Sequence, residues 1–410
     1  MSLLSPYRVL DLSTERGLLC GQVLGELGAD VIKIEPPGGS PARRIGPFRH
    51  GRSDDSEASL YWWAYNRNKR SITLDVTSAE GRNVLLRLVE RADFVIESDN
   101  SGAMAALGLG YDDLAAVNSK LIYVSITPFG QDGPKASYAD SDLVILAASG
   151  FIALTGDDDR PPVRVTVPQA YLHASADGAA GALIALWERH RSGRGQQVDV
   201  SAQQSMNLAT FCSSLVAALG MSENRRLSGG YKYGDYLLRQ VFACKDGHVA
   251  ITFLFGNAMG PFTRRLMQWV HDEGFCDDAT RDIDWIGYGE LLMHGAVPHD
   301  DFEGLKQTLE TFTKTKTKAE LLQAALTKRL LVAPVATIDE VVSNEQLAAR
   351  DYWRDVDGVR YPGPFVKLSP QPIEYRLRAP RLGEHNREVY IDELGMSEAE
   401  LADLQTKGIV

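Results

Sequence analysis

The sequence of 410 residues has no run of apolar residues long enough to cross a membrane, and it has few cysteines. The four cysteines lie far apart without a C-x-x-C pair, so they predict neither a disulfide framework nor a structural zinc site. The N-terminus, MSLLSPYRVLDLS, lacks the basic region and apolar core of a secretory signal. We therefore expect a reduced, cytoplasmic protein without a membrane partner.

The common catalytic signatures are also missing. No G-x-G-x-x-G follows the first predicted strand, and there is no G-x-x-x-x-G-K-[ST], H-E-x-x-H or G-x-S-x-G. The eight histidines are scattered without metal-ligand spacing, so we expect no metal site. General motifs therefore leave the chemistry unassigned.

The net charge is −11, which makes the chain a poor general binder of nucleic acid. One segment, residues 43–70, has a positive net charge although the whole chain is acidic, because it contains seven basic residues and three acidic ones. It indicates a site for an anionic small molecule, although a solvated loop with clustered charge is the alternative. The basic residues of this segment are Arg43, Arg44, Arg49, Arg52, Arg67, Lys69 and Arg70.

The first 200 residues alternate between strand and helix patterns. Helices are predicted at 17–28, 77–92 and 170–190, the second with Thr77 as N-cap and Glu80 completing a capping box. The third is amphipathic, with an apolar stripe that includes Ile184 and Trp187. Because strands separated by helices form parallel sheets, we expect an α/β, Rossmann-like large domain. The predicted strands span 7–13, 30–39, 71–76, 92–98, 121–130 and 197–201.

Beyond a helix predicted from 203 to about 219, the pattern changes. Residues 229–238 are predicted as a loop, and 241–255 as a hairpin turning at Asp246-Gly247. Helices are predicted at 259–270, 302–313, 318–329 and 398–405, with a strand and helix of the large domain following residue 330. We expect a large domain of residues 1–220 and 333–410, interrupted by a smaller α+β domain at 221–332.

Segments spread over nearly the whole chain carry a family resemblance. The segments LGADVIKIEPPGGS, YNRNKRSITLD, LIYVSITPFGQDGP, RSGRGQQVDVS and APRLGEHN occur in this order. Together they resemble the class III CoA-transferase family, which includes formyl-CoA transferase, carnitine-CoA transferase and α-methylacyl-CoA racemase. The resemblance implies an interlocked dimer whose active site lies where two chains meet. It also implies that an acyl-CoA thioester and a carboxylic acid are the substrates, with no permanently bound cofactor.

The resemblance further implies an aspartate nucleophile at the start of the long helix that ends in G-R-G-Q. Counting back from Gly193 without gaps puts this position at Tyr171, or at Ala170 with a one-residue slip, and no Asp or Glu lies within five residues of Tyr171. The racemase histidine position falls at Ser141. Other candidates for catalysis are His173 and Asp177, which are spaced to pair along a helix, and Asp142.

The CoA contacts implied by the resemblance fall after three of the predicted strands. An arginine common in relatives is Ala106 here, and Arg16 together with the basic segment is expected to hold the phosphate end of CoA instead. The expected CoA-contact residues are Arg16, Gly17, Leu74, Asp75, Ser98, Asp99, Asn100 and Lys69.

The leading hypothesis is a CoA-transferase subunit that lacks its own nucleophile. Some members of the family, such as benzylsuccinate CoA-transferase, are built from two related chains, so we expect either a homodimer or a heterodimer with an aspartate-bearing subunit. One alternative is a non-catalytic acyl-CoA-binding or scaffold protein. Another is an acyl-CoA-processing enzyme with a different mechanism.

Overall fold

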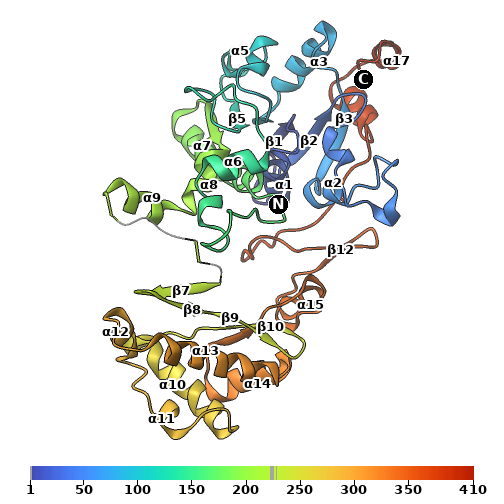
Figure 1. Cartoon of the computed structure of the whole chain (residues 1–410). Helices are drawn as coiled ribbons and strands as arrows, with labels where there is room; N and C mark the ends of the chain where they lie inside the picture. Colours follow the sequence, from blue (N-terminus) through green and yellow to red (C-terminus); the bar gives the residue numbers. More distant parts are fainter. Residues whose placement is uncertain (1, 222–225, 228) are drawn as a thin grey trace. The chain divides into compact units, whose positions relative to one another are not determined.

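The structure is a computed structural model that describes residues 2–221, 226–227 and 229–410. Its contacts divide the chain into two units, and Figure 1 shows the order of the elements along them. The first unit comprises Met1–Ala153, Arg164–Asn224 and Leu347–Val410, and the second comprises Leu154–Val163 and Arg225–Gln346. The domain limits predicted from the sequence, at residues 220 and 333, remain predictions.

Six parallel strands form the sheet of the first unit, in the order β3-β2-β1-β4-β5-β6. This is the strand order of the Rossmann fold, and it confirms the predicted α/β class. The strands are β1 (Arg8–Asp11), β2 (Asp30–Glu35), β3 (Lys69–Thr73), β4 (Phe94–Glu97), β5 (Ile122–Thr127) and β6 (Gln196–Ser201).

Both faces of this sheet are buried, because successive strand residues point to opposite sides. Val9 belongs to one hydrophobic core, with α1 and α7, whereas Leu10 belongs to the other, with α3 and α5. The helices of the first core are α1 (Leu18–Glu26), α6 (Asp142–Ala148), α7 (Ala170–Ser192) and α8 (Ala202–Leu208). Those of the second are α3 (Ala79–Val89), α4 (Ala103–Ala106), α5 (Tyr111–Val117) and α17 (Glu398–Thr406). Outside these two sets lie α2 (Leu60–Tyr65), α9 (Phe211–Ala218), α16 (Glu345–Ala349) and the β12–β13 hairpin (Arg354–Val356, Val359–Tyr361).

Two helix predictions are wrong in detail. The cap of α3 is Ser78, whose Oγ accepts from the Gly81 amide at 3.0 Å. Thr77 is not the cap because the carboxylate of Asp75 binds its amide and hydroxyl. The single helix predicted from 203 to 219 is two helices, α8 and α9, separated where the hydroxyl of Thr210 donates to the carbonyl of Asn207.

The second unit is α+β. The predicted hairpin is confirmed as β9 (Val241–Cys244) and β10 (Gly247–Ile251), to which β11 (Val332–Pro334) adds a third antiparallel strand. The strand near 332 therefore pairs within this unit and not with the large sheet. The helices of the unit are α10 (Gly256–Asp272), α11 (Asp278–Arg281), α12 (Tyr288–Met293), α13 (His299–Lys314), α14 (Lys318–Lys328) and α15 (Ile338–Val342).

The loop predicted at 229–238 is wrong. This segment is a hairpin of β7 (Gly230–Tyr233) and β8 (Tyr236–Arg239). Its turn consists of Gly234 and Asp235, and Gly234 adopts a φ of 55°, which suits a tight two-residue turn.

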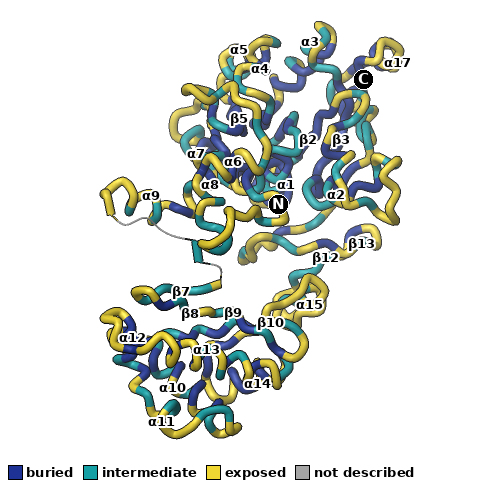
Figure 2. The backbone as a smooth tube through the Cα atoms, viewed as in Figure 1, coloured by how far each residue is buried: buried dark blue, intermediate teal, exposed yellow. Residues whose placement is uncertain are grey.

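The long helix α7 packs mainly through small residues and not through the two large residues Ile184 and Trp187 of its predicted stripe. Ala174, Gly178 and Ala182 are buried, whereas Ile184 and Trp187 are 70% and 71% exposed. The helix α9, which follows α8, has no buried residue, and Figure 2 shows it as an exposed element. Within the described residues, no helix is long and apolar enough to span a membrane.

Candidate functional site

The loops after β1 and β4 meet at the carboxyl edge of the large sheet. β1 lies between β2 and β4 in the sheet, so the order of the strands reverses its direction here. In open parallel sheets this switch point is where ligands bind. The Thr14 amide donates to Ser98 Oγ at 2.8 Å, which joins the two loops directly.

Gly17 is required by this close approach. A Cβ at Gly17 would lie 2.6 Å from the Cβ of Ser13 and 3.4 Å from the Cβ of Ser98. Any larger residue would push the two loops apart.

Arg16 connects the switch point to a third segment. One guanidinium nitrogen donates to the Ser98 carbonyl at 3.2 Å and to Asn100 Oδ1 at 3.0 Å. The other lies 2.7 Å from Oδ1 of Asp140. The structure therefore brings Arg16, Gly17, Ser98 and Asn100 together, and it adds Asp140, which the sequence reasoning missed.

Tyr171 lies in the first turn of α7, and its hydroxyl donates a hydrogen bond to the carboxylate of Asp140. The side chain of Asp140 is only 7% exposed. Burial raises the pKa of Asp140, which Arg16 opposes and Glu15 reinforces. Asp140 lies 31 residues before Tyr171, so no local spacing relates the two.

Asp142 caps α7. Its Oδ1 accepts from the amides of Gln169 and Ala170 at 2.7 and 2.9 Å, and Arg164 pairs with Oδ2 at 3.2 Å. The carboxylate thus satisfies amides at the helix start that have no partner within the helix. Ser141 caps α6 through the Val144 amide.

His173 and Asp177 do not form the predicted pair: among the described residues no hydrogen bond or ion pair joins them. His173 is exposed. Asp177 instead lines an open groove beside β6 and α8. A pair on an exposed helix face is worth a fraction of a kcal/mol, about 0.3–0.5, which explains why it need not form.

Leu74, Asp75 and Asp99 line one cavity of about 340 Å³ at the carboxyl ends of β1 to β4. The walls include Thr14, Pro36 and apolar side chains of α4 and its flanks. Burial raises the pKa of Asp99, against the opposing effects of Arg16 and Lys33. We call this the switch-point cavity. Its lining includes Thr14, which lies two residues before Arg16 in the same loop.

A buried carboxyl supports the turn that carries Asp99. Glu97 Oε2 accepts from the Asp99 amide at 2.8 Å, and Oε1 contacts Ser125 Oγ and Gln131 Nε2. Burial raises the pKa of Glu97 to about 7, although the bonds from Ser125 and the Asp99 amide oppose the rise.

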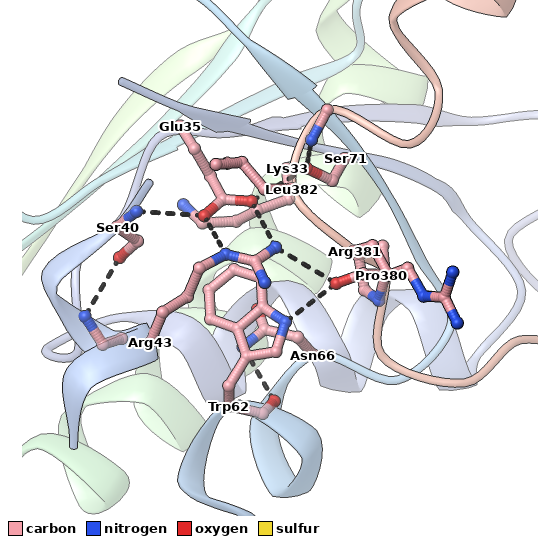
Figure 3. A network of polar contacts seen from close by, with 12 residues as sticks. Lys33, Glu35, Ser40, Arg43, Trp62, Asn66, Ser71, Pro380, Arg381 and Leu382 are labelled. Atoms are coloured by element: carbon pink, nitrogen blue, oxygen red, sulfur yellow. Dashed lines mark hydrogen bonds and ion pairs between the residues drawn. The ribbon is translucent and has the colours of Figure 1, made fainter. Parts of the chain in front are cut away.

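Four members of the basic segment are structural: Arg43, Arg67, Lys69 and Arg70. Arg43 binds both oxygens of Glu35, pairs with Glu57 and stacks on Trp62. It also donates to the carbonyl of Pro380, and Figure 3 shows its bonds to Glu35 and Pro380. Arg67 and Arg70 are held in the same way, by Glu26 and by acids that include Asp30. Their charge is neutralised within the fold.

The expectation that Lys69 contacts CoA is wrong. Lys69 is wholly buried, and its Nζ donates to Asp11 Oδ2, the Leu18 carbonyl and Asn66 Oδ1 at 2.8–2.9 Å. All three N–H groups are therefore used inside the protein. Burial lowers the pKa of Lys69 to about 8, although the charge of Asp11 opposes this shift.

Within the described part of the chain, no group of three or more His, Cys, Asp or Glu residues is arranged to hold a metal ion. The candidate site consists of a largely apolar cavity, one guanidinium and the Tyr171–Asp140 contact. It lies at the switch point of a doubly wound α/β protein.

Comparison with known proteins identifies the family. The chain belongs to CoA-transferase family III, whose model matches residues 4–386. Succinyl-CoA:(R)-benzylsuccinate CoA-transferase subunit BbsE of Thauera aromatica is 33% identical, over 99% of this chain and 98% of its own length. Succinyl-CoA--D-citramalate CoA-transferase of Chloroflexus aurantiacus is 31% identical, over 99% and 98%.

The fold agrees with this assignment. The crystal structure of a CAIB/BAIF family protein from Brucella suis superposes with a TM-score of 0.83 at 28% identity, covering 95% of this chain and 99% of that one. The resemblance to a CoA-transferase family of enzymes is thus confirmed.

Proposed function

We propose that this chain is the nucleophile-lacking subunit of a two-subunit CoA-transferase, which moves CoA from an acyl-CoA thioester to a carboxylic acid. In this reaction a carboxylate of the partner attacks the thioester carbonyl. The C–S bond breaks, CoA leaves as the thiolate, and the acyl group remains on the carboxylate as a mixed anhydride. The acceptor carboxylate then attacks the partner's own carbonyl carbon in this anhydride and displaces the donor acid as its carboxylate. The CoA thiolate finally attacks the acyl carbon of the acceptor, which forms the new thioester and releases the partner's carboxylate.

The observation that carries the proposal is Tyr171 in the first turn of α7, where the family pattern has aspartate. The hydroxyl of Tyr171 is hydrogen-bonded to Asp140, and a neighbouring carboxylate disfavours the phenolate form. A neutral phenol is a poor nucleophile toward a thioester. Tyr171 therefore does not replace the missing aspartate.

Two further observations support a partner chain. The relative from Thauera aromatica is named as a subunit of its enzyme. In addition, α7 exposes a row of apolar residues at helical spacing, which we call the α7 stripe: Ala176, Ala180, Ile184 and Trp187. Exposed apolar rows of this kind mark protein interfaces. The assembly is a heterodimer with a related aspartate-bearing chain, interlocked as in the family.

The substrates we propose are succinyl-CoA as donor and an organic acid as acceptor. The support is that both relatives described above are named for succinyl-CoA. CoA is held at the switch-point cavity, where Leu74, Asp75 and Asp99 form the walls, with Arg16 at the adjoining loop.

Turnover tests this assignment. The purified chain alone should transfer CoA from succinyl-CoA to an acceptor acid at a negligible rate. Mixing it with a related chain that carries aspartate at the position of Tyr171 should raise turnover by at least a hundredfold. Equal turnover with and without that chain would contradict the proposal.

Asp140 supports a second candidate, a transferase with a displaced nucleophile. It is the carboxylate in contact with Tyr171, and it is almost buried. If Asp140 attacks the thioester, hydroxylamine added to the chain alone with succinyl-CoA converts Asp140 to a hydroxamate. Peptide mass spectrometry would detect this product, and Asp140→Asn would abolish it.

A further inference from the structure

A second cavity, of about 560 Å³, lies between the loop after β2 and the C-terminal tail of the first unit. It is separate from the switch-point cavity and shares none of its lining residues. We call it the basic cavity, and its lining includes Arg49, Arg52, Trp63, Tyr361, Arg378 and Arg381.

The three acidic residues of the basic cavity are already neutralised. Asp55 pairs with Arg52 at 3.2 Å, Glu57 with Arg43 at 3.0 Å, and Asp357 lies 3.6 Å from Arg378. Arg378 is also bound by Glu384, which is outside the lining.

Two guanidinium groups remain without an acid. Among the described residues, the side chains of Arg49 and Arg381 make no hydrogen bond or ion pair, and both line this cavity. In Figure 3 the side chain of Arg381 extends away from the Glu35–Arg43 network. The cavity therefore carries two positive charges that the fold does not use.

The walls also offer aromatic surface. The guanidinium of Arg49 lies 5.4 Å from the centre of the Trp63 ring, and Trp63 is fixed by donation from its Nε1 to the Glu57 carbonyl at 2.9 Å. Tyr361 lines the same cavity. Paired guanidinium groups suit phosphate oxygens, and an indole face suits a planar ring.

We propose that the basic cavity binds a diphosphate carried on a planar base, as in a nucleoside diphosphate. Arg49 and Arg381 would hold the phosphate oxygens, and Trp63 would pack against the base. Two sources share this chemistry, a free nucleotide and the nucleotide end of CoA.

Calorimetric titration of the full chain with ADP tests the proposal. The double variant Arg49→Ala/Arg381→Ala should weaken ADP binding by about a hundredfold, because each charge-assisted contact is worth about tenfold. Arg44→Ala is the matched control: Arg44 is an exposed arginine of the same segment outside the cavity, and its loss should leave binding unchanged. Inorganic pyrophosphate should bind more weakly than ADP, since it has no base.

A second arm distinguishes the two sources. If the double variant weakens CoA binding together with ADP binding, the cavity holds the nucleotide end of CoA, and if it leaves CoA binding at the switch-point cavity unchanged, the basic cavity holds a free nucleotide. The proposal is overturned if the chain does not bind ADP, if the double variant binds ADP as the unaltered chain does, or if Arg44→Ala weakens binding equally. None of these results depends on transferase turnover.

Discussion

Single residues decide the chemistry of this chain. Tyr171 removes the carboxylate expected at the start of α7, and Asp140 returns a carboxylate to the same place from another segment, held by Arg16. The lack of a carboxylate at position 171 could be predicted from the sequence. The G-R-G-Q pattern marks the end of the same helix, so the position is found by counting back along that helix. Asp140 could not be predicted, because a contact across 31 residues depends on how the chain turns between α6 and α7.

Glu97 provides a prediction at the same scale. Its pKa is near 7 in the fold and about 4.5 in an unfolded chain, so the folded state keeps a proton that the unfolded state releases. The free energy of unfolding should therefore fall as pH rises from about 4.5 to 7, by about 2 kcal/mol relative to Glu97→Gln.

Urea denaturation across this range measures the difference between the two proteins. Glu90→Gln, an exposed carboxyl on α3's end, serves as the control and should keep the slope of the unaltered chain. A Glu97→Gln variant with that same slope would contradict the protonation of Glu97 in the fold.

At the scale of elements, the start of α7 depends on a carboxylate from outside the helix. Asp142→Ala removes the acceptor of the Gln169 and Ala170 amides and should lower the free energy of unfolding by about 1–2 kcal/mol. Asp142→Asn keeps an acceptor oxygen and should recover most of this loss. Asp132→Ala, an exposed loop position, should change little; thermal denaturation in which all three variants match the unaltered chain would contradict the capping role.

The elements that sequence could predict are those with local signals. Parallel strands such as β2, β4 and β5 could be predicted because each is rich in apolar residues, and the β9–β10 hairpin because of Asp246-Gly247. The β7–β8 hairpin could not be predicted because its strands are rich in tyrosine and glycine, so the segment around Gly234-Asp235 is more typical of a loop. The packed face of α7 could not be predicted because it consists mostly of alanine and glycine, which carry little hydropathy signal.

The site residues that could be predicted are likewise those with a local signal in the sequence. Arg16, Gly17, Ser98 and Asn100 lie at strand ends, where topology gathers loops at one edge. Lys69 has the same formal charge as a ligand-binding lysine, but it belongs to an internal cluster with Asp11. A count of charged residues along a segment does not distinguish a lysine in a buried ion pair from a lysine that is free to bind a ligand.

At the scale of the whole molecule, the α7 stripe predicts association. Ile184→Lys/Trp187→Lys should dissociate the heterodimer of this chain with its aspartate-bearing relative at micromolar concentration, because burying two ammonium groups against a partner is unfavourable. Val117→Lys alters an exposed valine on the opposite side of the sheet and should leave the dimer intact. Sedimentation velocity measures both. An unaltered chain that forms no complex with its aspartate-bearing relative, or a double variant that still forms one, would contradict the interface.

The central claim is that the acyl group is carried by a partner chain and not by this one. The direct measurement adds hydroxylamine and succinyl-CoA to the complex of this chain with its aspartate-bearing relative, followed by peptide mass spectrometry of both. Our account predicts one hydroxamate for each complex, on the partner's aspartate, and none on the Asp140 or Asp142 peptides of this chain. A stoichiometric hydroxamate on Asp140, Asp142 or Asp177 would contradict it.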